Sequence, residues 1–244
     1  MSVVIQIGEL EINDEDLFPL LAQYRILPQL AKEVIIERAI ANIECTNEEE
    51  KIARQRFYQQ FQITTEAQIK LWLKHHGMTP EQLDRLVLRE IKLEKYKQET
   101  WGNQVESQFL QSKRQLDRVV YSLIRSKDAG IAQELFFRIQ EGETSFTELA
   151  RKYSEGTEAE TGGLIGPVEL NVPHPKIAQM LSATRPGQLI PPTRVGDWWI
   201  VLRLEKYLSA QLDDQMRQRI LNELFQAWLN AEYQQKVSYK SILY

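Results

Sequence analysis

Through the first 115 residues, apolar side chains recur every three to four positions, which is the spacing of amphipathic helices. Capping signals mark where these helices begin. The clearest is Thr79-Pro80, because the capping threonine is followed by proline at the first helical position and by Gln82 at the third. Thr46 and Thr65 open two earlier helices in a similar way. The pattern predicts a short strand at 3–7 and helices at about 14–24, 28–43, 47–61, 66–76, 80–101 and 105–115.

The pattern changes at Arg118. The β-branched stretch 118–124 predicts a strand, and two amphipathic helices are predicted to follow it, at 130–140 and 146–153. A polar, glycine-rich loop then leads into further strands at 164–168, 189–192 and 198–204, with a short helix at 175–182 between them. Together these elements predict a small α+β unit of about ninety residues.

Helical spacing returns at Ala210 and continues for about twenty residues. A lone helix with this much apolar surface needs another element to pack against, and the N-terminal helices are the nearest partners of its kind. We therefore expect the α+β unit to be an insert and the C-terminal helix to pack back on the N-terminal domain. The predicted fold is α+β, with domains at 1–115, 116–208 and 209–244.

Composition excludes several classes of function. The net charge is −4 and the cations are scattered, which argues against nucleic acid as a partner, and no stretch approaches the ~18 apolar residues of a membrane span. Of the three histidines, His75 and His76 are adjacent and so lie on different faces of a helix; we expect no metal site and no cofactor. The single cysteine, Cys45, is expected in an apolar core. The N-terminus lacks the features of a secretory signal, which predicts a cytoplasmic protein.

Motifs spread over the α+β unit carry a family resemblance. They are S-F-T-E-L-A-R-K-Y-S-E, G-G-L-I-G-P, I-A-Q-M-L-S-A-T-R-P-G-Q-L-I-P-P and D-W-W-I-V-L-R-L-E. In this order they resemble a parvulin-type, or rotamase, domain over roughly residues 118–207. The helical remainder resembles, in its order of helices, the chaperone part of the SurA and PrsA foldases. The resemblance implies an FKBP-like α+β fold, isomerisation of exposed X-Pro bonds and binding of unfolded chains.

The resemblance also implies a cluster of polar residues around the twisted amide, and this chain lacks the histidines of that cluster. The family's histidine on the first strand falls at Tyr121 to Leu123, and the one on the last strand falls at Trp199 or Ile200. Tyr121 is predicted either to line a peptide groove or to hold its hydroxyl in water. His174, which is the remaining histidine of the unit, matches neither position.

The glycine-rich loop keeps only part of the family's acidic set. Where active relatives often carry Asp and Cys, this chain has Glu155 and Gly156, and Leu164 replaces the usual aspartate after the glycine pair. Glu155 is therefore the one catalytic candidate, with Ser154 as an additional hydroxyl. A solvated loop carboxylate is the favoured alternative for Glu155.

The apolar wall of a peptide groove is retained. Ile177 and Leu181 fall where the family places its proline pocket, near Pro173, although core packing is the favoured interpretation of each. Trp198 and Trp199 are adjacent on a strand and so face opposite sides of it. The predicted peptide groove consists of Tyr121, Leu123, Ser154, Gly156, Leu164, Pro173, Ile177, Leu181, Trp199 and Ile200.

Two functions follow from these residues. One is a folding enzyme that isomerises X-Pro bonds with a reduced polar cluster. The other is a non-catalytic protein that holds an unfolded or extended, proline-containing polypeptide, or docks on one dedicated client of a peptide-maturation or export system. The missing histidines favour binding, with weak or absent isomerase activity. Only Arg125 and Lys127 follow the first strand, which argues against phosphate-directed selectivity.

Overall fold

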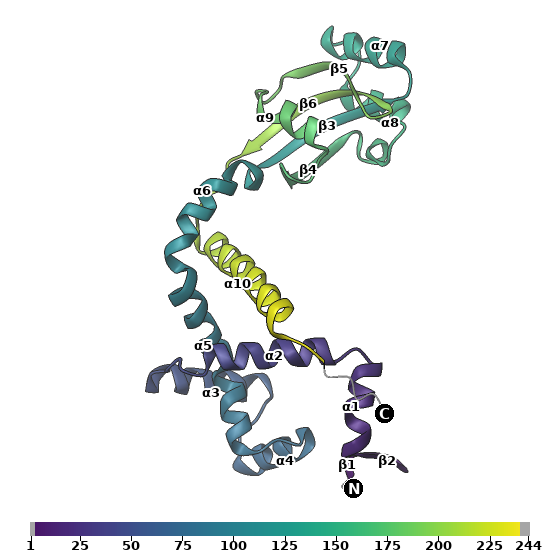
Figure 1. Cartoon of the computed structure of the whole chain (residues 1–244). Coiled ribbons are helices and arrows are strands. Elements are labelled where there is room, and N and C mark those ends of the chain that lie inside the picture. Colours follow the sequence, from purple (N-terminus) through teal and green to yellow (C-terminus); the bar gives the residue numbers. More distant parts are fainter. Residues whose placement is uncertain (1–2, 240–244) are drawn as a thin grey trace. The chain divides into compact units, whose positions relative to one another are not determined.

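Figure 1 shows the computed structural model of the chain, which describes residues 3–239. The chain divides into two compact units. The first unit contains the residues up to Val105 and those from Arg217 onward, and the second unit, Glu106–Met216, is inserted between them in the sequence. These limits lie outside the predicted 116–208 on both sides.

The first unit is helical apart from a hairpin near its N-terminus. Strands β1 (Val3–Ile7) and β2 (Leu10–Asn13) pair in antiparallel fashion. The sequence pattern does not predict β2, because its four residues are too few to show a clear alternation. The helices are α1 (Asp14–Gln23), α2 (Leu27–Ile40), α3 (Asn47–Gln60), α4 (Glu66–His76), α5 (Pro80–Trp101) and, continuing from the second unit, α10 (Asp214–Lys236).

The predicted capping boxes form, and they confirm where α3, α4 and α5 begin. Thr46, Thr65 and Thr79 each accept a hydrogen bond at 3.3 Å from the backbone N–H three residues further on. The side chain at that third position accepts a bond from the threonine N–H in return. Gly77 ends α4 at a φ of 62°, a left-handed conformation that glycine adopts without steric cost.

Helices α3, α4 and α5 share one apolar core in the first unit. Phe57 of α3, Leu73 of α4, and Leu83 and Val87 of α5 are all buried in it. The ring of Trp72 meets the ring of Phe57 edge to face, with 5.2 Å between their centroids. The helical spacing of the apolar residues thus orients one face of each helix toward a common centre.

The C-terminal helix α10 lies against α5 within the first unit. Lys97 of α5 is only 6% exposed, and its Nζ donates hydrogen bonds to Asn222 Oδ1 at 2.7 Å and to Glu94 Oε1 at 2.6 Å. The same Nζ lies 5.2 Å from the ring centroid of Phe225, whose ring centroid is 6.2 Å from that of Trp101. The apolar face of α10 therefore finds its partner on a helix that precedes it by more than a hundred residues in the sequence.

The second unit is a four-stranded antiparallel sheet with helices on both faces (Figure 1). The strand order is β4-β3-β6-β5. Its elements are α6 (Val105–Leu116), which follows the 3-10 turn η1 (Gly102–Gln104), β3 (Arg118–Ser126), α7 (Ala129–Gln140), α8 (Phe146–Tyr153), the 3-10 turn η2 (Thr157–Thr161), β4 (Leu164–Glu169), α9 (Pro175–Ser182), β5 (Leu189–Val195) and β6 (Trp198–Leu208). The predicted α+β fold is confirmed.

Alternation along β3 divides the core of the second unit in two. Tyr121 and Leu123 point to the face covered by α9, where they pack with Ile177 and Leu181. Ile124 points to the opposite face, which α7 and α8 cover. Because side chains alternate along a strand, Arg125 shares the α9 face with Tyr121 and Leu123.

Gly163 is required where the glycine-rich loop approaches β3. Its φ is +85°, and an added Cβ would lie 2.8 Å from the carbonyl oxygen of Leu123. The Leu123 N–H donates to the Gly163 carbonyl at 2.9 Å, and the Gly163 N–H donates to the Glu158 carbonyl at 2.7 Å. The glycine pair therefore fixes the loop directly beside the strand.

Asp117 connects the beginning and the end of the second unit. Its carboxylate accepts hydrogen bonds from the Tyr207 hydroxyl at 2.6 Å and the Ala210 N–H at 2.7 Å, and Lys113 Nζ lies 3.4 Å away. Burial by itself raises the pKa of Asp117, but these hydrogen bonds outweigh it and hold that pKa below its usual value. Burial, together with the bond to Asp117, raises the pKa of Tyr207 to about 12.

Candidate functional site

A cavity of about 410 Å³ opens on the α9 face of the sheet in the second unit. Its floor is apolar and buried, formed by Leu123 of β3, Ile177 of α9 and Ile200 of β6. A concave, mostly apolar surface with a few fixed polar groups is typical of a binding site. The residues that line the cavity are Tyr121, Leu123, Arg125, Ile165, Pro173, His174, Ile177, Val195, Gly196, Asp197, Trp198 and Ile200.

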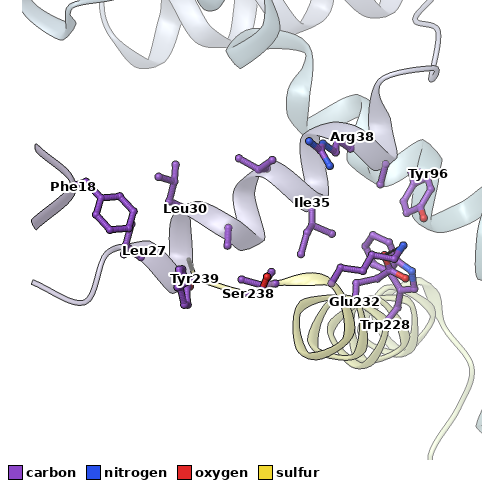
Figure 2. A pocket seen from close by; sticks show the side chains of 15 residues that line it. Phe18, Leu27, Leu30, Ile35, Arg38, Tyr96, Trp228, Glu232, Ser238 and Tyr239 are labelled. Carbon is purple, nitrogen blue, oxygen red and sulfur yellow. Dashed lines mark ion pairs between the residues drawn. The ribbon is translucent and has the colours of Figure 1, made fainter. Parts of the chain in front are cut away.

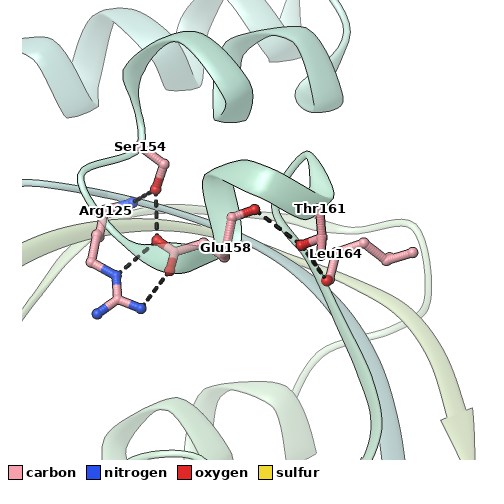
Figure 3. Close-up of polar contacts among 5 residues, drawn as sticks. All are labelled: Arg125, Ser154, Glu158, Thr161 and Leu164. Atoms are coloured by element: carbon pink, nitrogen blue, oxygen red, sulfur yellow. Dashed lines mark hydrogen bonds and ion pairs between the residues drawn. The ribbon is translucent and has the colours of Figure 1, made fainter.

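A network of Arg125, Ser154 and Glu158 stands at one side of this cavity (Figure 3). Arg125 Nε donates to Glu158 Oε1 at 2.7 Å and Arg125 Nη2 donates to Glu158 Oε2 at 2.5 Å. The Ser154 hydroxyl also donates to Glu158 Oε1, at 2.6 Å, and accepts the Arg125 backbone N–H at 3.1 Å. The paired geometry is the bidentate arrangement that guanidinium and carboxylate groups favour.

Glu158 is ionised in spite of its burial. Its side chain is 2% exposed, whereas that of Arg125 is 32% exposed. Burial by itself raises the pKa of Glu158, but the hydrogen bonds from Arg125 and Ser154 outweigh it and hold that pKa below its usual value. The bond to Glu158 in turn raises the pKa of Arg125. Arg125 is therefore a permanently charged group, fixed on one edge and partly open to the cavity.

The sequence comparison looks for the loop's acidic group at Glu155 and Gly156, but the structure supplies it from Glu158. An alanine Cβ built at Gly156 would lie 2.3 Å from Glu158 Oε2 and 2.3 Å from Arg125 Nε. The ion pair thus occupies the space that a side chain at position 156 would fill. Gly156 is not a groove residue as predicted, because it has no side chain to present and lies behind the pair.

Glu155, the predicted catalytic candidate, does not line the cavity. Its Oε1 accepts hydrogen bonds from the Ser126 hydroxyl at 3.0 Å and from the Lys127 N–H at 2.8 Å. Its own N–H donates to the Arg125 carbonyl at 3.0 Å. Glu155 is exposed and binds the last residues of β3, so the structure gives its catalytic role no support and agrees better with the favoured alternative of a loop carboxylate in solvent.

Tyr121 lines the cavity, which decides between its two predicted roles. The residue is 5% exposed, so its hydroxyl is not held out in water. Burial is the main cause that raises the pKa of Tyr121; Glu158 also raises it, and Arg125 opposes the shift. The phenol therefore stays protonated and adds a donor to the same side of the cavity as Arg125.

Trp198, and not Trp199 as predicted, forms the cavity wall. The Arg125 guanidinium carbon lies 5.9 Å from the Trp198 ring centroid, and Lys127 Nζ lies 5.4 Å from it. Trp199 packs on the opposite face of the sheet, against the core that contains Ile124. Strand alternation predicts that the two rings face opposite sides, but only the pairing of Arg125 with Ile200 decides which ring joins the cavity.

Several other predicted groove residues are placed differently by the structure. Leu164 pairs with Ser122 and so lies on the far face, while its neighbour Ile165 pairs with Tyr121 and lines the cavity. Leu181 is fully buried in the core behind the cavity, as its favoured interpretation holds. Ser154 acts through Glu158 instead of lining the cavity. Tyr121, Leu123, Pro173, Ile177 and Ile200 are in the cavity lining.

His174 is a cavity residue that the family comparison misses. Its Nδ1 accepts the Lys176 N–H at 3.2 Å and so caps α9. The signal available in the sequence is Pro175, which opens a helix and makes the preceding residue its cap. Within residues 3–239, no three His, Cys, Asp or Glu side chains gather closely enough to hold a metal ion.

The first unit contains a separate groove of about 760 Å³ between α2 and α10 (Figure 2). Leu30 and Val34 of α2 line it with 45% and 44% of their surface exposed, and Trp228 of α10 lines it as well. Tyr239 closes one end, and its hydroxyl lies 3.1 Å from that of Tyr233. Exposed apolar residues collected in one groove are typical of a surface that binds other apolar chains.

A family model described as "Rotamase: PPIC-type PPIASE domain" matches residues 125–206. The chain contains a PPIC-type rotamase domain. The match runs from Arg125 near the end of β3 into β6, and it includes the polar network and all the cavity residues except Tyr121 and Leu123, which lie just before it. In the described part of the chain, no helix is both long and apolar enough to cross a membrane.

Part of the chain is similar in sequence to curated chaperones. The chain is 32% identical over 121 residues to Chaperone SurA of Shewanella sp. (strain MR-7), which covers 45% of this chain and 28% of that protein. It is also 32% identical over 109 residues to Chaperone SurA of Pseudomonas savastanoi pv. phaseolicola (strain 1448A / Race 6), covering 41% and 25%. The chain thus matches about a quarter of the length of these relatives.

One solved structure is similar over the whole chain. The crystal structure of a peptidylprolyl isomerase, PrsA, from Bacillus cereus matches with a TM-score of 0.51 and 16% identity, over 99% of this chain and 94% of that chain. At this identity the likeness concerns the fold. It agrees with a helical unit into which a rotamase domain is inserted.

Proposed function

We propose that this chain is a parvulin-type, isomerase-like chaperone that binds exposed polypeptide segments and takes proline-containing ones in the rotamase cavity. The observation that supports this most is the cavity on the α9 face. Its floor of Leu123, Ile177 and Ile200 is buried and apolar, which suits a prolyl ring, and the indole of Trp198 offers a flat wall for the neighbouring residue.

We propose that the isomerase activity is weak. Rotation about the X-Pro amide has a barrier of about 18–20 kcal/mol, and a groove lowers it only through groups that favour the twisted amide. By the family resemblance, imidazoles are expected within Tyr121–Leu123 and at Trp199 or Ile200, where this chain has none, and the cavity's one imidazole, of His174, caps α9 with its Nδ1. The apolar floor by itself binds the ring but stabilises its two isomers similarly, so any acceleration depends on the few polar groups at the cavity wall.

The groove in the first unit is proposed to hold longer apolar segments of the same clients. Leu30 and Val34 are half-exposed and lie in the same groove; single exposed apolar residues are ordinary, but several in one groove indicate an interaction surface. Arg38 and Glu232 supply a polar rim of both charges, which suits an extended backbone of varied sequence. Client binding by this groove does not require proline.

The cavity is tested with a matched pair of tryptophan variants. Binding of a fluorescently labelled proline peptide to the full chain is measured by anisotropy. We expect Trp198→Ala to weaken binding about tenfold or more, because large aromatic anchors dominate such interfaces. Trp199→Ala removes the adjacent ring on the opposite face of the sheet and leaves the affinity within about twofold. Equal losses in both variants would contradict a binding role for the cavity.

The groove is tested by placing a negative charge on its apolar surface. Leu30→Asp should abolish most of the chain's ability to suppress aggregation of an unfolded client, measured by light scattering. The control is Leu71→Asp, because Leu71 is exposed on α4 and does not line the groove. If both variants suppress aggregation as well as the wild-type chain, client binding lies elsewhere.

Two narrower predictions remain proposals. A dedicated client of a peptide-maturation or export system would give one tight interaction in place of weak binding to many unfolded chains. Competition between a panel of unrelated unfolded clients distinguishes the two cases. The cytoplasmic location stays a prediction, and cell fractionation with an antibody against the chain tests it.

A further inference from the structure

The guanidinium group of Arg125 is held in place on two sides. Glu158 binds its Nε and Nη2 edge, and the Trp198 ring lies against it at 5.9 Å. Among the residues that the structure describes, Nη1 has no hydrogen-bond partner, and Figure 3 shows the guanidinium nitrogen away from Glu158 pointing clear of the network. Arg125 lines the same cavity as the apolar floor. The cavity wall therefore contains a fixed guanidinium group that still has donor capacity on its Nη1.

The chemistry of amide rotation gives such a donor a role. In the planar amide, the nitrogen lone pair is shared with the carbonyl group, so the nitrogen is a poor acceptor. When the C–N bond is twisted by a quarter turn, the lone pair returns to the nitrogen, which becomes pyramidal and accepts a hydrogen bond. A donor placed at that nitrogen stabilises the transition state more than either planar isomer, which is the condition for catalysis.

We propose that Arg125 is the catalytic residue of the rotamase domain and donates a hydrogen bond from its free Nη1 edge to the prolyl nitrogen of the twisted amide. No bond is formed or broken in this step, and no proton is transferred. The proposal rests on the binding of proline segments in the cavity. In this role, the guanidinium group of Arg125 takes the place of the imidazoles that the strands lack, and it stays charged at every physiological pH.

Glu158 and Ser154 are positioning residues in this account. Glu158 does not reach substrate, because both of its oxygens are taken by Arg125 and Ser154. Their effect is to hold the guanidinium plane at one orientation and to keep the second donor edge turned to the cavity. Gly156 allows this arrangement, because a side chain at that position would displace the pair.

The chain offers a matched control for Arg125. Arg203 is also a half-buried arginine of the sheet, with a side chain 31% exposed; its Nε lies 2.7 Å from Glu205 Oε1, and its guanidinium lies 5.1 Å from the Phe146 ring centroid. It pairs with Ser122 and therefore points to the face opposite the cavity. A general loss of stability affects both arginine variants, whereas a loss of catalysis affects only one.

The test measures cis–trans exchange of a proline peptide by two-dimensional NMR with the full chain, alongside the binding affinity of the same peptide. We expect the wild-type chain to accelerate exchange measurably. Arg125→Lys should lower the rate at saturating peptide about tenfold or more, with the dissociation constant within about twofold. Arg203→Lys should leave both values unchanged. Retention of the wild-type rate in Arg125→Lys would overturn the assignment.

Chemical rescue separates a catalytic donor from a structural one. Millimolar guanidinium should restore part of the exchange rate to Arg125→Ala and none to Arg203→Ala, because only the first leaves an open donor site in the cavity. Glu158→Gln should lower the rate by a smaller factor than Arg125→Ala without changing peptide affinity. Absence of rescue, with an intact NMR spectrum, counts against the proposal.

Two results with the wild-type chain separate the catalytic role of Arg125 from peptide binding in the cavity. If the wild-type chain binds the peptide but does not accelerate exchange, the catalytic role of Arg125 is refuted and the binding function stands. If the wild-type chain does not bind the peptide, the proposed function of the cavity fails, and the inference fails with it.

Discussion

Replacement of Gly156 by alanine tests the Arg125–Glu158 pair through the sign of a stability change. Gly156 has φ −117° and ψ 174°, an extended conformation that alanine adopts equally well. At such a position, glycine to alanine normally stabilises a protein by about 0.4–1 kcal/mol, because the unfolded chain loses freedom. Without the ion pair, the variant is therefore expected to be more stable than the wild type.

The structure predicts the opposite sign. The new Cβ would lie 2.3 Å from Arg125 Nε and 2.3 Å from Glu158 Oε2, well inside van der Waals contact. Relief of the contact requires the pair to separate, which loses hydrogen bonds between charged groups worth about 1.5–3 kcal/mol in total, or leaves overpacking of similar cost. After subtraction of the entropic gain, we expect the second unit to be destabilised by about 1–2 kcal/mol.

Native-state hydrogen exchange measures this change within the second unit alone. The Leu123 amide, bonded to the Gly163 carbonyl at 2.9 Å, reports opening of β3 and the loop. A loss of about 1–2 kcal/mol speeds its exchange by about five- to thirtyfold. Gly130→Ala, in the first turn of α7 and away from the ion pair, is the control; its Cβ would lie 3.1 Å from Asp128 Oδ1, and we expect it to change the exchange rate of the Leu123 amide by less than about twofold.

The same substitution in a chain without the ion pair tests whether the pair causes the loss of stability. In the double variant Arg125→Ala, Glu158→Ala, the clash is absent, and Gly156→Ala should become stabilising by about 0.4–1 kcal/mol. If Gly156→Ala stabilises the otherwise wild-type chain, the loop does not hold the pair as the structure shows. If it destabilises both backgrounds equally, the clash arises from some other neighbour.

Further predictions concern ionisable groups and the helical unit. The pKa of Asp117 lies below its usual value in the folded chain. The ionised carboxylate therefore stabilises the fold above the pKa that Asp117 has in the unfolded chain, and this stabilisation is lost as the pH falls through the pKa of the folded chain. Urea unfolding between pH 7 and about pH 3 checks this prediction. The pKa of Tyr207 is raised to about 12 from an ordinary value of 10.0. The protonated phenol therefore stabilises the fold below pH 10.0, and this stabilisation is lost as the pH rises through about 12. Tyr207→Phe should abolish that loss of stability at alkaline pH. Lys97→Ala removes the buried donor to Asn222 and should destabilise the first unit by about 1–3 kcal/mol in thermal unfolding. Glu155→Ala should leave peptide affinity within about twofold, because this carboxylate lies outside the cavity.

Helix starts and ends that depend only on residues close together in the chain could be predicted from the sequence. The box at Thr79 involves residues three apart, and its threonine, proline and glutamine satisfy the first turn of α5 without help from the rest of the chain. The same is true of Gly77, whose left-handed conformation needs no tertiary contact. Such local signals place the helix starts in the first unit to within a residue.

The polar network could not be predicted, because it depends on contacts across the chain. Arg125 and Glu158 are 33 residues apart, and they meet only because η2 turns the loop back onto β3. The family resemblance directs attention to Glu155 and Gly156. The Glu158 carboxylate instead fills the space that a side chain at position 156 would occupy, and that placement depends on the fold of the loop.

Strand register explains the remaining differences between the predicted groove residues and the observed cavity lining. Trp198 and Trp199, and Leu164 and Ile165, alternate between the two faces, and a shift of one residue would exchange their roles. The sequence shows the alternation but not which set faces α9. The groove of the first unit also could not be predicted, because the sequence does not show that the apolar residues of α2 and α10 line one common groove.

The most direct test of the account is an NMR titration of the full chain with a proline peptide, in which the five tryptophan indole signals are followed. The account predicts that the Trp198 indole and the amides of Tyr121, Ile165 and Ile177 shift together and saturate at one dissociation constant, while the Trp199 indole stays unchanged. Shifts confined to the Trp228 indole in the helical unit, or no shift at the cavity when the peptide is saturating, would contradict the claim that the rotamase cavity binds polypeptide.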